Sequence, residues 1–388
     1  ARILRHSSST STSKRSTSWS FSIACEARSR SREVTALTER LGGEVQMVIG
    51  SRFVNRARPR SPRGLAMAYA VMALWHGPLS DALGRRPVIL VGVLFFVLAS
   101  IGFCVMHDAN HGSYSTKPWL NDLLGLTLNA MGGNSYFWKQ KHNIIHHTYT
   151  NVDGLDDDIA KSPIIRQCES QRWVPAHKVQ YLYLVPVYSL SVIFWVFIMD
   201  FTKYFTHKIY TTDAWKMTLK NHIVFWATKV WYVAIYMVLP ITVWGFWEWL
   251  VGYMALNATM GLTLSLVFQL AHVVENTEFE HVPLDMTKHI ETAWAEHQVK
   301  TTSNFAMNNP VISWFVGGLN FQIEHHLFPR VSHIHYPAIS KIVMQKCKEF
   351  NLPYNKYDTM FEALASHFRV MKDLGKKPVV AFEEVKAA

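Results

Sequence analysis

Long apolar segments constrain this chain more than any other feature of its sequence. A helix needs about 20 predominantly apolar residues to cross the hydrocarbon core of a membrane. Three segments reach this length: 87–106 (PVILVGVLFFVLASIGFCVM), 223–246 and 250–271. A fourth, 181–199, is nearly as long. These segments predict an integral membrane protein built from helices.

The positive charge of the chain is concentrated at its amino-terminal end. Residues 1–64 hold thirteen Lys and Arg against four Glu, so about +9 of the net charge of +11 lies there. The remaining residues carry too little charge to support a nucleic-acid-binding function. Residues 1–63 are rich in Ser and Arg and lack apolar periodicity, which predicts a disordered basic tail. We expect a single membrane domain over 64–388.

Histidines are clustered at three places, and the first two clusters have helical spacing. HDANH begins at His107 and ends at His111, and HNIIHH contains His142, His146 and His147. Residues four apart lie on one face of a helix, so the sequence predicts two bidentate pairs, His107 with His111 and His142 with His146. His147 is turned about 100° away from His146 and could reach a second metal.

The third cluster and one isolated histidine extend the set of candidate ligands. QIEHH places Gln322, His325 and His326 on one helical face. His272 ends an apolar segment, where an ionisable group suggests a function; the alternative is a histidine bonded to a backbone carbonyl. Seven or eight histidines exceed the three or four ligands of one zinc site and predict two metal ions, although imidazole binds Fe, Zn, Cu and Ni alike.

A shared metal site limits the membrane topology. If all three clusters lie on one aqueous face, the chain crosses the membrane an even number of times between His147 and His325. Segment 223–246 then leaves that face and 250–271 returns to it. Segment 181–199 is left as a helix in the membrane interface or on the aqueous domain. The Lys-bearing run 203–220 places the histidine face in the cytosol by the positive-inside rule.

Two resemblances to known families follow from these motifs. The loop GPLSDALGRRPVILVG (77–92) resembles the signature loop of major facilitator transporters, which supports a transporter as the non-enzyme alternative. The three histidine clusters resemble the histidine boxes of membrane fatty acid desaturases. Gln322 at the head of the third box is typical of front-end members. FQLAHVVE, HQVKTTSNF and GGLNFQIEHHLFP are also similar to the later half of that family, and the resemblance covers roughly 98–370.

The desaturase resemblance implies a fold, a set of ligands and co-reactants. It implies about four transmembrane helices under a cytosolic helical cap, with a di-iron centre that uses O2 and two electrons. No HPGG haem motif of a fused cytochrome domain is present. The electrons would therefore come from a separate donor of the ferredoxin or cytochrome b5 type, together with its reductase. By the family pattern the iron ligands are His107, His111, His142, His146, His147, His272, His325 and His326.

The chemistry of desaturation explains why such a site would be needed. A methylene group in an acyl chain has no acidity that a side-chain base could exploit, so an oxidising metal cofactor has to supply the difficult step. A fatty acyl substrate, on coenzyme A or on a membrane lipid, is implied. A hydroxylase or ketolase of the same iron–histidine superfamily is the alternative within this class.

Carboxylates that accept the second ring N–H of a histidine ligand would compensate part of the metal charge. The candidates are Asp108, Asp156, Asp157, Asp158, Glu275 and Glu324, and Gln322 is either a weak ligand or an outer-shell partner. For the acidic run 153–158 a solvated loop is an equally good interpretation. His281, His289 and His297 are expected to be solvated loop residues without a metal role.

Overall fold

The computed structural model describes residues 101–159, 164–281 and 292–378. The tail 1–63, the transporter-like loop 77–92 and His289 lie outside the described residues. So does segment 87–106, apart from its last six residues. The described part is mostly helical, and its six short strands pair into three two-stranded sheets.

Three helices are long and apolar enough to cross a membrane among the described residues: Pro175–Thr206, Leu219–Trp244 and Phe246–His272. The first consists of η3 (Pro175–Val179), α9 (Gln180–Phe194), η4 (Trp195–Met199) and α10 (Asp200–Thr206). The second consists of α11 (Leu219–Val233), η5 (Ala234–Val238) and α12 (Leu239–Trp244), and the third is α13 (Phe246–His272). By length and composition these helices suggest a membrane protein.

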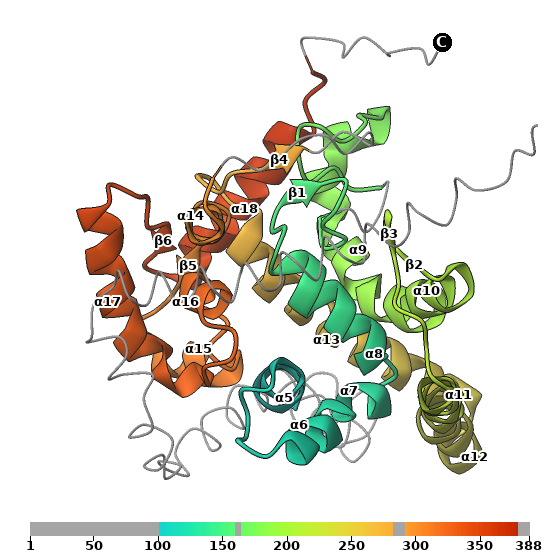
Figure 1. Cartoon of the computed structure of the whole chain (residues 1–388). Coiled ribbons are helices and arrows are strands. Elements are labelled where there is room, and N and C mark those ends of the chain that lie inside the picture. The colour runs from blue at the N-terminus through green and yellow to red at the C-terminus, as the bar shows by residue number, and fades with distance from the viewer. Residues whose placement is uncertain (1–100, 160–163, 282–291, 379–388) are drawn as a thin grey trace, which may run out of the picture.

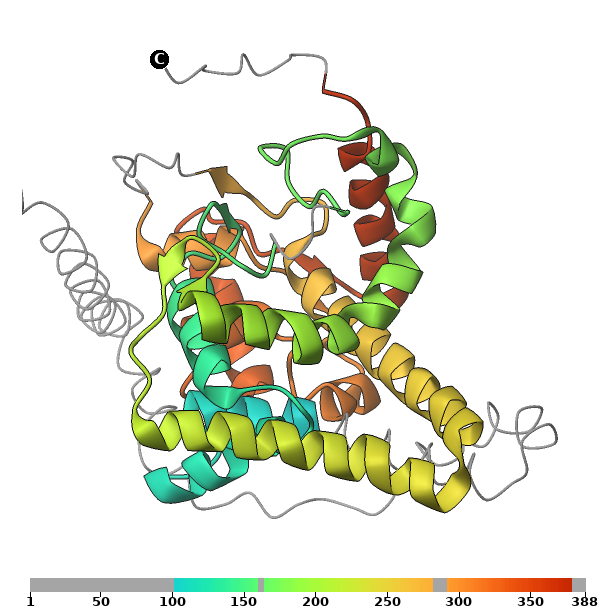
Figure 2. The ribbon, with the colours of Figure 1, turned by 90° about the vertical axis from the view of Figure 1, so that its right-hand side faces the viewer.

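Segment 181–199, which the parity argument set aside, lies in the first of these helices. The helix changes direction between α9 and α10, where η4 is a π-helix (Figure 2). Such π-turns are a common cause of sharp bends. Leu184 and Tyr188 of α9 pack with Val273 and with Met371 of α18 (Met360–Leu374). By length and composition α9–α10 could span a membrane, but its first half is packed against helix α18.

Helices α11–α12 and α13 form a hairpin that turns at Gly245 (Figure 2). Gly245 has a φ of 98°, and a Cβ there would lie 2.8 Å from Oε2 of Glu248. A residue without a side chain is therefore needed at this turn. The hairpin exposes large apolar side chains: Leu219, Ile223, Trp226, Val230, Trp231, Val243, Trp244, Trp247 and Val251. Lipid would cover this surface, since soluble proteins rarely expose such an apolar area.

The carboxy-terminal part of the chain forms a helical cap on one side of α13 (Figure 1). Its elements are α14 (Trp294–Lys300), α15 (Pro310–Phe315), α16 (Gln322–Leu327), η6 (His333–His335), α17 (Tyr336–Glu349) and α18. Helix α17 covers α16 through a core that includes Ile323, Leu327, Tyr336 and Ile339. Helix α18 begins with a capping box, in which Thr359 and Glu362 bond each other's backbone N–H groups.

Two parallel strand pairs join segments that are far apart in the sequence. Strand β1 (Val152–Asp153) pairs with β4 (Glu280–His281), and β5 (Asn304–Phe305) pairs with β6 (Lys356–Tyr357). Strands β2 (Lys208–Ile209) and β3 (Thr212–Asp213) form an antiparallel hairpin between α10 and α11. The first pair holds the segment after the second histidine cluster beside the segment after α13.

Short helices carry the first two histidine clusters. They are η1 (Ile101–Met106), α5 (His107–His111), α6 (Pro118–Gly125), α7 (Thr127–Ala130), α8 (Ser135–Trp138) and η2 (Lys139–His146). Helix α5 ends at Gly112, whose φ of 75° allows its N–H to bond Asp108 and Ala109 carbonyls. The histidines of this region lie between the cap and α13.

Candidate metal centre

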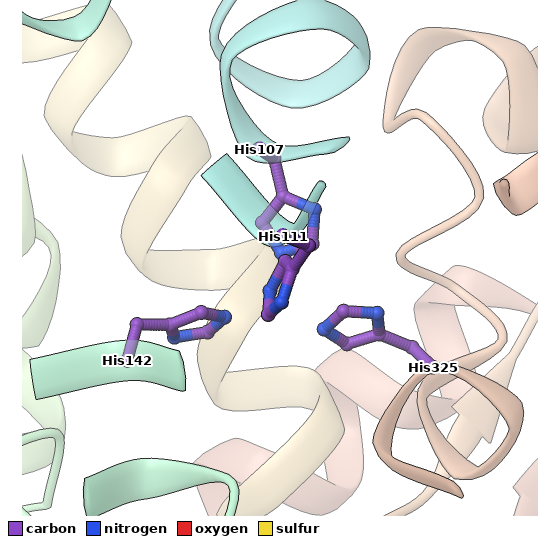
Figure 3. Close-up of side chains that lie close together, drawn as sticks. All are labelled: His107, His111, His142 and His325. Atoms are coloured by element: carbon purple, nitrogen blue, oxygen red, sulfur yellow. The ribbon is translucent and has the colours of Figure 1, made fainter. Parts of the chain in front are cut away.

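Four histidines from three helices converge into a first group. His107 and His111 come from α5, His142 from η2 and His325 from α16, and Figure 3 shows the four rings facing one another. One ring nitrogen of each lies within 4.8 Å of the others, and all four residues are buried. The spacing of His107 and His111 therefore forms the expected pair on one helical face.

A second group consists of His146, His272 and His326, which also lie within 4.8 Å of one another and are buried. His142 and His146 are divided between the two groups, but they also share a third set with Asp158, in which the ligand atoms again lie within 4.8 Å of one another. Their rings stack with centroids 5.1 Å apart, so the two side chains lie on one side of η2, as the spacing predicts. Their joint role at one metal stays a prediction.

His325 and His326 are also divided between the two groups, as neighbours on a helix point in different directions. The ring of His147 lies between the groups. It stacks on His326 at 4.3 Å and lies 4.8 Å from His111 and 4.7 Å from His325, measured between ring centroids. His147 is thus close to both groups and belongs to neither by nitrogen distance, and its expected reach to a second metal stays a prediction.

Three of these histidines use one ring nitrogen for a protein contact and leave the other without one. His146 Nδ1 lies 2.9 Å from Asp156 Oδ2. His325 Nδ1 lies 3.1 Å from the Tyr336 hydroxyl, and His326 Nδ1 lies 2.7 Å from Gln298 Oε1. The Nε2 atoms of the same three rings are buried and have no hydrogen-bond partner among the described residues. Buried nitrogens are rarely left in this state without a reason, and protein-bound Nδ1 with vacant Nε2 is the pattern of metal-binding histidines. The donor set therefore fits metal ions.

Burial controls the protonation of the histidines. It lowers the pKa of His142, His147, His325 and His326 well below the ordinary value, and neighbouring histidines lower it further. His146 differs: burial would lower its pKa, but the Asp156 carboxylate outweighs burial and the pKa is raised. Neutral imidazole has the free electron pair that a metal ion requires.

The acidic run is buried, so its interpretation as a solvated loop is wrong. Asp156, Asp157 and Asp158 are 0%, 6% and 8% exposed. Asp156 contacts His146, while Asp157 accepts from Lys203 Nζ at 2.7 Å and Asp158 from Lys141 Nζ at 2.8 Å. Two of the three carboxylates are thus neutralised by lysines. The third faces a histidine of the second group.

The other carboxylate candidates differ in their contacts. Asp108 contacts His333 Nδ1 at 2.7 Å and lies 3.7 Å from His107 Nδ1. Glu324 instead accepts bonds from Asn304 and Tyr354, and burial raises its pKa to about 7. Glu275 is bound by Arg369 at the protein surface.

Gln322 and the remaining histidines are also placed by the structure. The Gln322 amide oxygen is buried and has no hydrogen-bond partner among the described residues. His272 Nδ1 lies 3.5 Å from the Thr301 carbonyl, which is the backbone contact of the alternative interpretation. His272 also belongs to the second histidine group, as expected of a metal ligand. His281 is half exposed beside Asp153. His297 is buried in α14, contrary to the expectation of a solvated loop residue.

Sequence reasoning missed Gln298, Thr150 and Tyr336, which contact the histidine groups. The motif HQVKTT contains Gln298, and its likeness to a family motif was the available signal. Nothing in the sequence pairs Gln298 with His326, because the contact forms between α14 and α16 only in the folded chain.

Comparison with known proteins identifies the family of the chain. A sequence profile described as fatty acid desaturase matches residues 85–358. The chain is 39% identical over 289 residues to an sn-1 linoleoyl-lipid 6-desaturase of Arthrospira platensis, an alignment that covers 74% of this chain and 77% of that protein. It is 37% identical over 298 residues to the sn-1 linoleoyl-lipid 6-desaturase of Synechocystis sp., with 75% and 81% covered. For an acyl-lipid (8-3)-desaturase of Physcomitrium patens the identity is 38% over 303 residues, with 74% and 61% covered.

The matched region contains all three histidine clusters and both histidine groups. It begins inside the transporter-like loop 77–92, so that loop does not define the class of the protein. The profile match and the relatives together set the transporter interpretation aside. The chain belongs to the fatty acid desaturase family and is an oxidoreductase that acts on fatty acyl chains.

Proposed function

We propose that the chain is a front-end acyl-lipid desaturase with two irons, one at each histidine group. The observation that carries the proposal is the set of buried Nε2 atoms that have no protein partner while Nδ1 of the same rings is held by Asp156, Tyr336 or Gln298. His107, His111, His142 and His325 would hold the first iron. His146, His272 and His326 would hold the second, with His147 available between them.

The two irons would supply the oxidising power for breaking unactivated C–H bonds. In the overall reaction two vicinal methylene groups lose two hydrogens and form a cis double bond, while O2, two electrons and two protons become two waters. The chain's own residues orient the imidazoles and keep them neutral. The histidines that would hold the irons are buried, so that the substrate acyl chain would be kept from water there.

The electron donor would be a separate protein of the ferredoxin or cytochrome b5 type. The substrate class is supported by the names of the relatives, which are linoleoyl-lipid and acyl-lipid desaturases. We infer the same class for this chain: an acyl group esterified in a membrane lipid, with the new double bond on the carboxyl side of an existing one.

The proposed topology has about four membrane-spanning helices, three of which are segment 87–106, α11–α12 and α13, and a cytosolic histidine site. Helices α11–α12 and α13 form one hairpin, and the end of α13 brings His272 into the second group. Segment 87–106 would be the helix that enters the site at His107. Single cysteines in 203–220, labelled by impermeant maleimide in sealed and opened vesicles, test the orientation. Labelling of intact cells from outside contradicts a cytosolic site.

Expression in cells fed defined fatty acids tests the function. A desaturase produces a product lighter by two hydrogens, whose double bond is located by mass spectrometry, and purified protein holds about two irons per chain. Pulse-labelled acyl-lipid and acyl-CoA supplied separately to membranes identify the carrier. A product that gains oxygen would instead show the hydroxylase or ketolase of the same superfamily, and active protein loaded with zinc alone would refute the di-iron centre.

A further inference from the structure

Helix α14 contacts the second histidine group at several points. Gln298 Oε1 lies 2.7 Å from His326 Nδ1, and the Thr301 carbonyl that follows the helix lies 3.5 Å from His272 Nδ1. His297 Nε2 lies 2.9 Å from the Thr150 carbonyl, which fixes the chain after His146. The helix thus touches two of the three rings and the segment that carries the third.

The contact of Gln298 with His326 depends on the tautomer of the ring. A metal ion needs the free electron pair of Nε2, so the ring proton has to be on Nδ1. An Nδ1–H group requires an acceptor, which the Gln298 amide oxygen provides at 2.7 Å. If the amide were turned by 180°, its NH2 group would face Nδ1, and the proton would be on Nε2, where it blocks the metal.

The Gln298 amide is placed at an energetic cost. Gln298 is fully buried, and its Nε2 has no hydrogen-bond partner among the described residues. Leaving a buried donor unsatisfied is unfavourable, because the group has given up its hydrogen bonds to water. The turned amide could satisfy that donor, because Thr150 Oγ1 lies 2.8 Å from the present amide oxygen. Such a cost suggests a role other than packing.

We propose that Gln298 is a positioning residue that sets the tautomer of His326 and thereby the affinity of the second histidine group for iron. The inference rests on the proposed di-iron function. It predicts that Gln298→Glu binds iron more tightly than Gln298→Met. A role in packing alone would predict the opposite order. Gln298→Glu keeps an acceptor oxygen and cannot present NH2 to the ring. Gln298→Met keeps the length of the side chain and removes the amide acceptor, which leaves only the more distant Thr150 Oγ1, 3.2 Å from His326 Nδ1.

Anaerobic titration of chelator-stripped, full-length protein with ferrous iron, with Mössbauer spectra to count the sites, tests this inference. We expect Gln298→Met to weaken one of the two irons by about 10- to 100-fold, as outer-shell substitutions do. We expect Gln298→Glu to bind both irons at least as tightly as the parent. If Gln298→Met does not fold, the comparison of Gln298→Glu with the parent still decides.

Gln180→Met is the matched control. Gln180 is also fully buried, but its amide bonds backbone atoms of Arg166 and Met371, away from the histidines. The Gln180→Met protein should bind both irons as tightly as the parent protein. A Gln298→Met protein with parental affinity for both irons, or a Gln298→Glu protein that binds iron less tightly than the parent, would overturn the inference. A parent protein that binds no iron would instead refute the proposed function.

Discussion

The buried ion pair between Asp157 and Lys203 allows a quantitative test of how the metal centre is supported. Lys203 Nζ lies 2.7 Å from Asp157 Oδ2, and each side chain is 8% exposed. The pair connects α10 to the acidic run that includes Asp156, which contacts His146. Burial would raise the pKa of Asp157, but Lys203 and Lys141 outweigh it and hold the pKa below its usual range.

Removing one partner should cost far more than removing both. Lys203→Met leaves a carboxylate buried without its nearest cation, and Asp157→Asn leaves a buried ammonium facing an amide. Each change should destabilise the protein by about 3–5 kcal/mol. In the double variant no charge is left unpaired, so the cost should fall to about 1–2 kcal/mol, mainly the imperfectly paired amide.

Tryptophan fluorescence during heating in detergent would measure these changes. Each single variant should melt roughly 6–10 °C below the parent, and the double variant should recover most of that loss. The exposed pair of Arg369 with Glu275 is the control, and Arg369→Met should leave the melting temperature unchanged. If the losses of the two single variants add in the double variant, the side chains are not coupled and the reasoning is wrong.

Three further predictions concern the metal centre and its surroundings. His146→Ala should lose iron and all activity, measured by iron analysis and product formation, because the second group then keeps two of its three histidines. Gln322→His should keep or raise iron content while sharply lowering turnover, and Gln322→Asn should lower activity with less effect on iron; a fully active Gln322→His enzyme would leave Gln322 only an orienting role. Burial raises the pKa of Glu324 from 4.5 to about 7, so its contribution to stability is complete below pH 4.5 and is lost as pH rises through 7, by about 3 kcal/mol. Glu324→Gln should abolish this loss. The melting temperature of the metal-free variant, relative to that of the metal-free parent, should therefore rise between pH 5 and 8. A difference that does not change with pH would contradict the raised pKa of Glu324.

Local spacing in the sequence was sufficient for the kind of protein and for the identity of its histidines. The apolar segments 223–246 and 250–271 correspond to the hairpin of α11–α12 and α13, because the length needed to cross lipid is a property of each segment by itself. The spacing in HDANH predicted that His107 and His111 act together, because both lie on one short α-helix. Whether the eight histidines hold iron remains a prediction.

The tertiary structure alone decided how the histidines are divided and what surrounds them. His142 groups with His107, His111 and His325, and its neighbour His146 groups with His272 and His326, because other parts of the chain bring different partners to each ring. The acidic run is buried because Lys141 and Lys203 reach it from other elements, and Gln298 meets His326 because α14 packs beside α16. Pairings of this kind depend on the packing of segments far apart in the chain. Local sequence patterns therefore identified the histidines, and long-range packing determined which of them lie close together and which partners hold their rings.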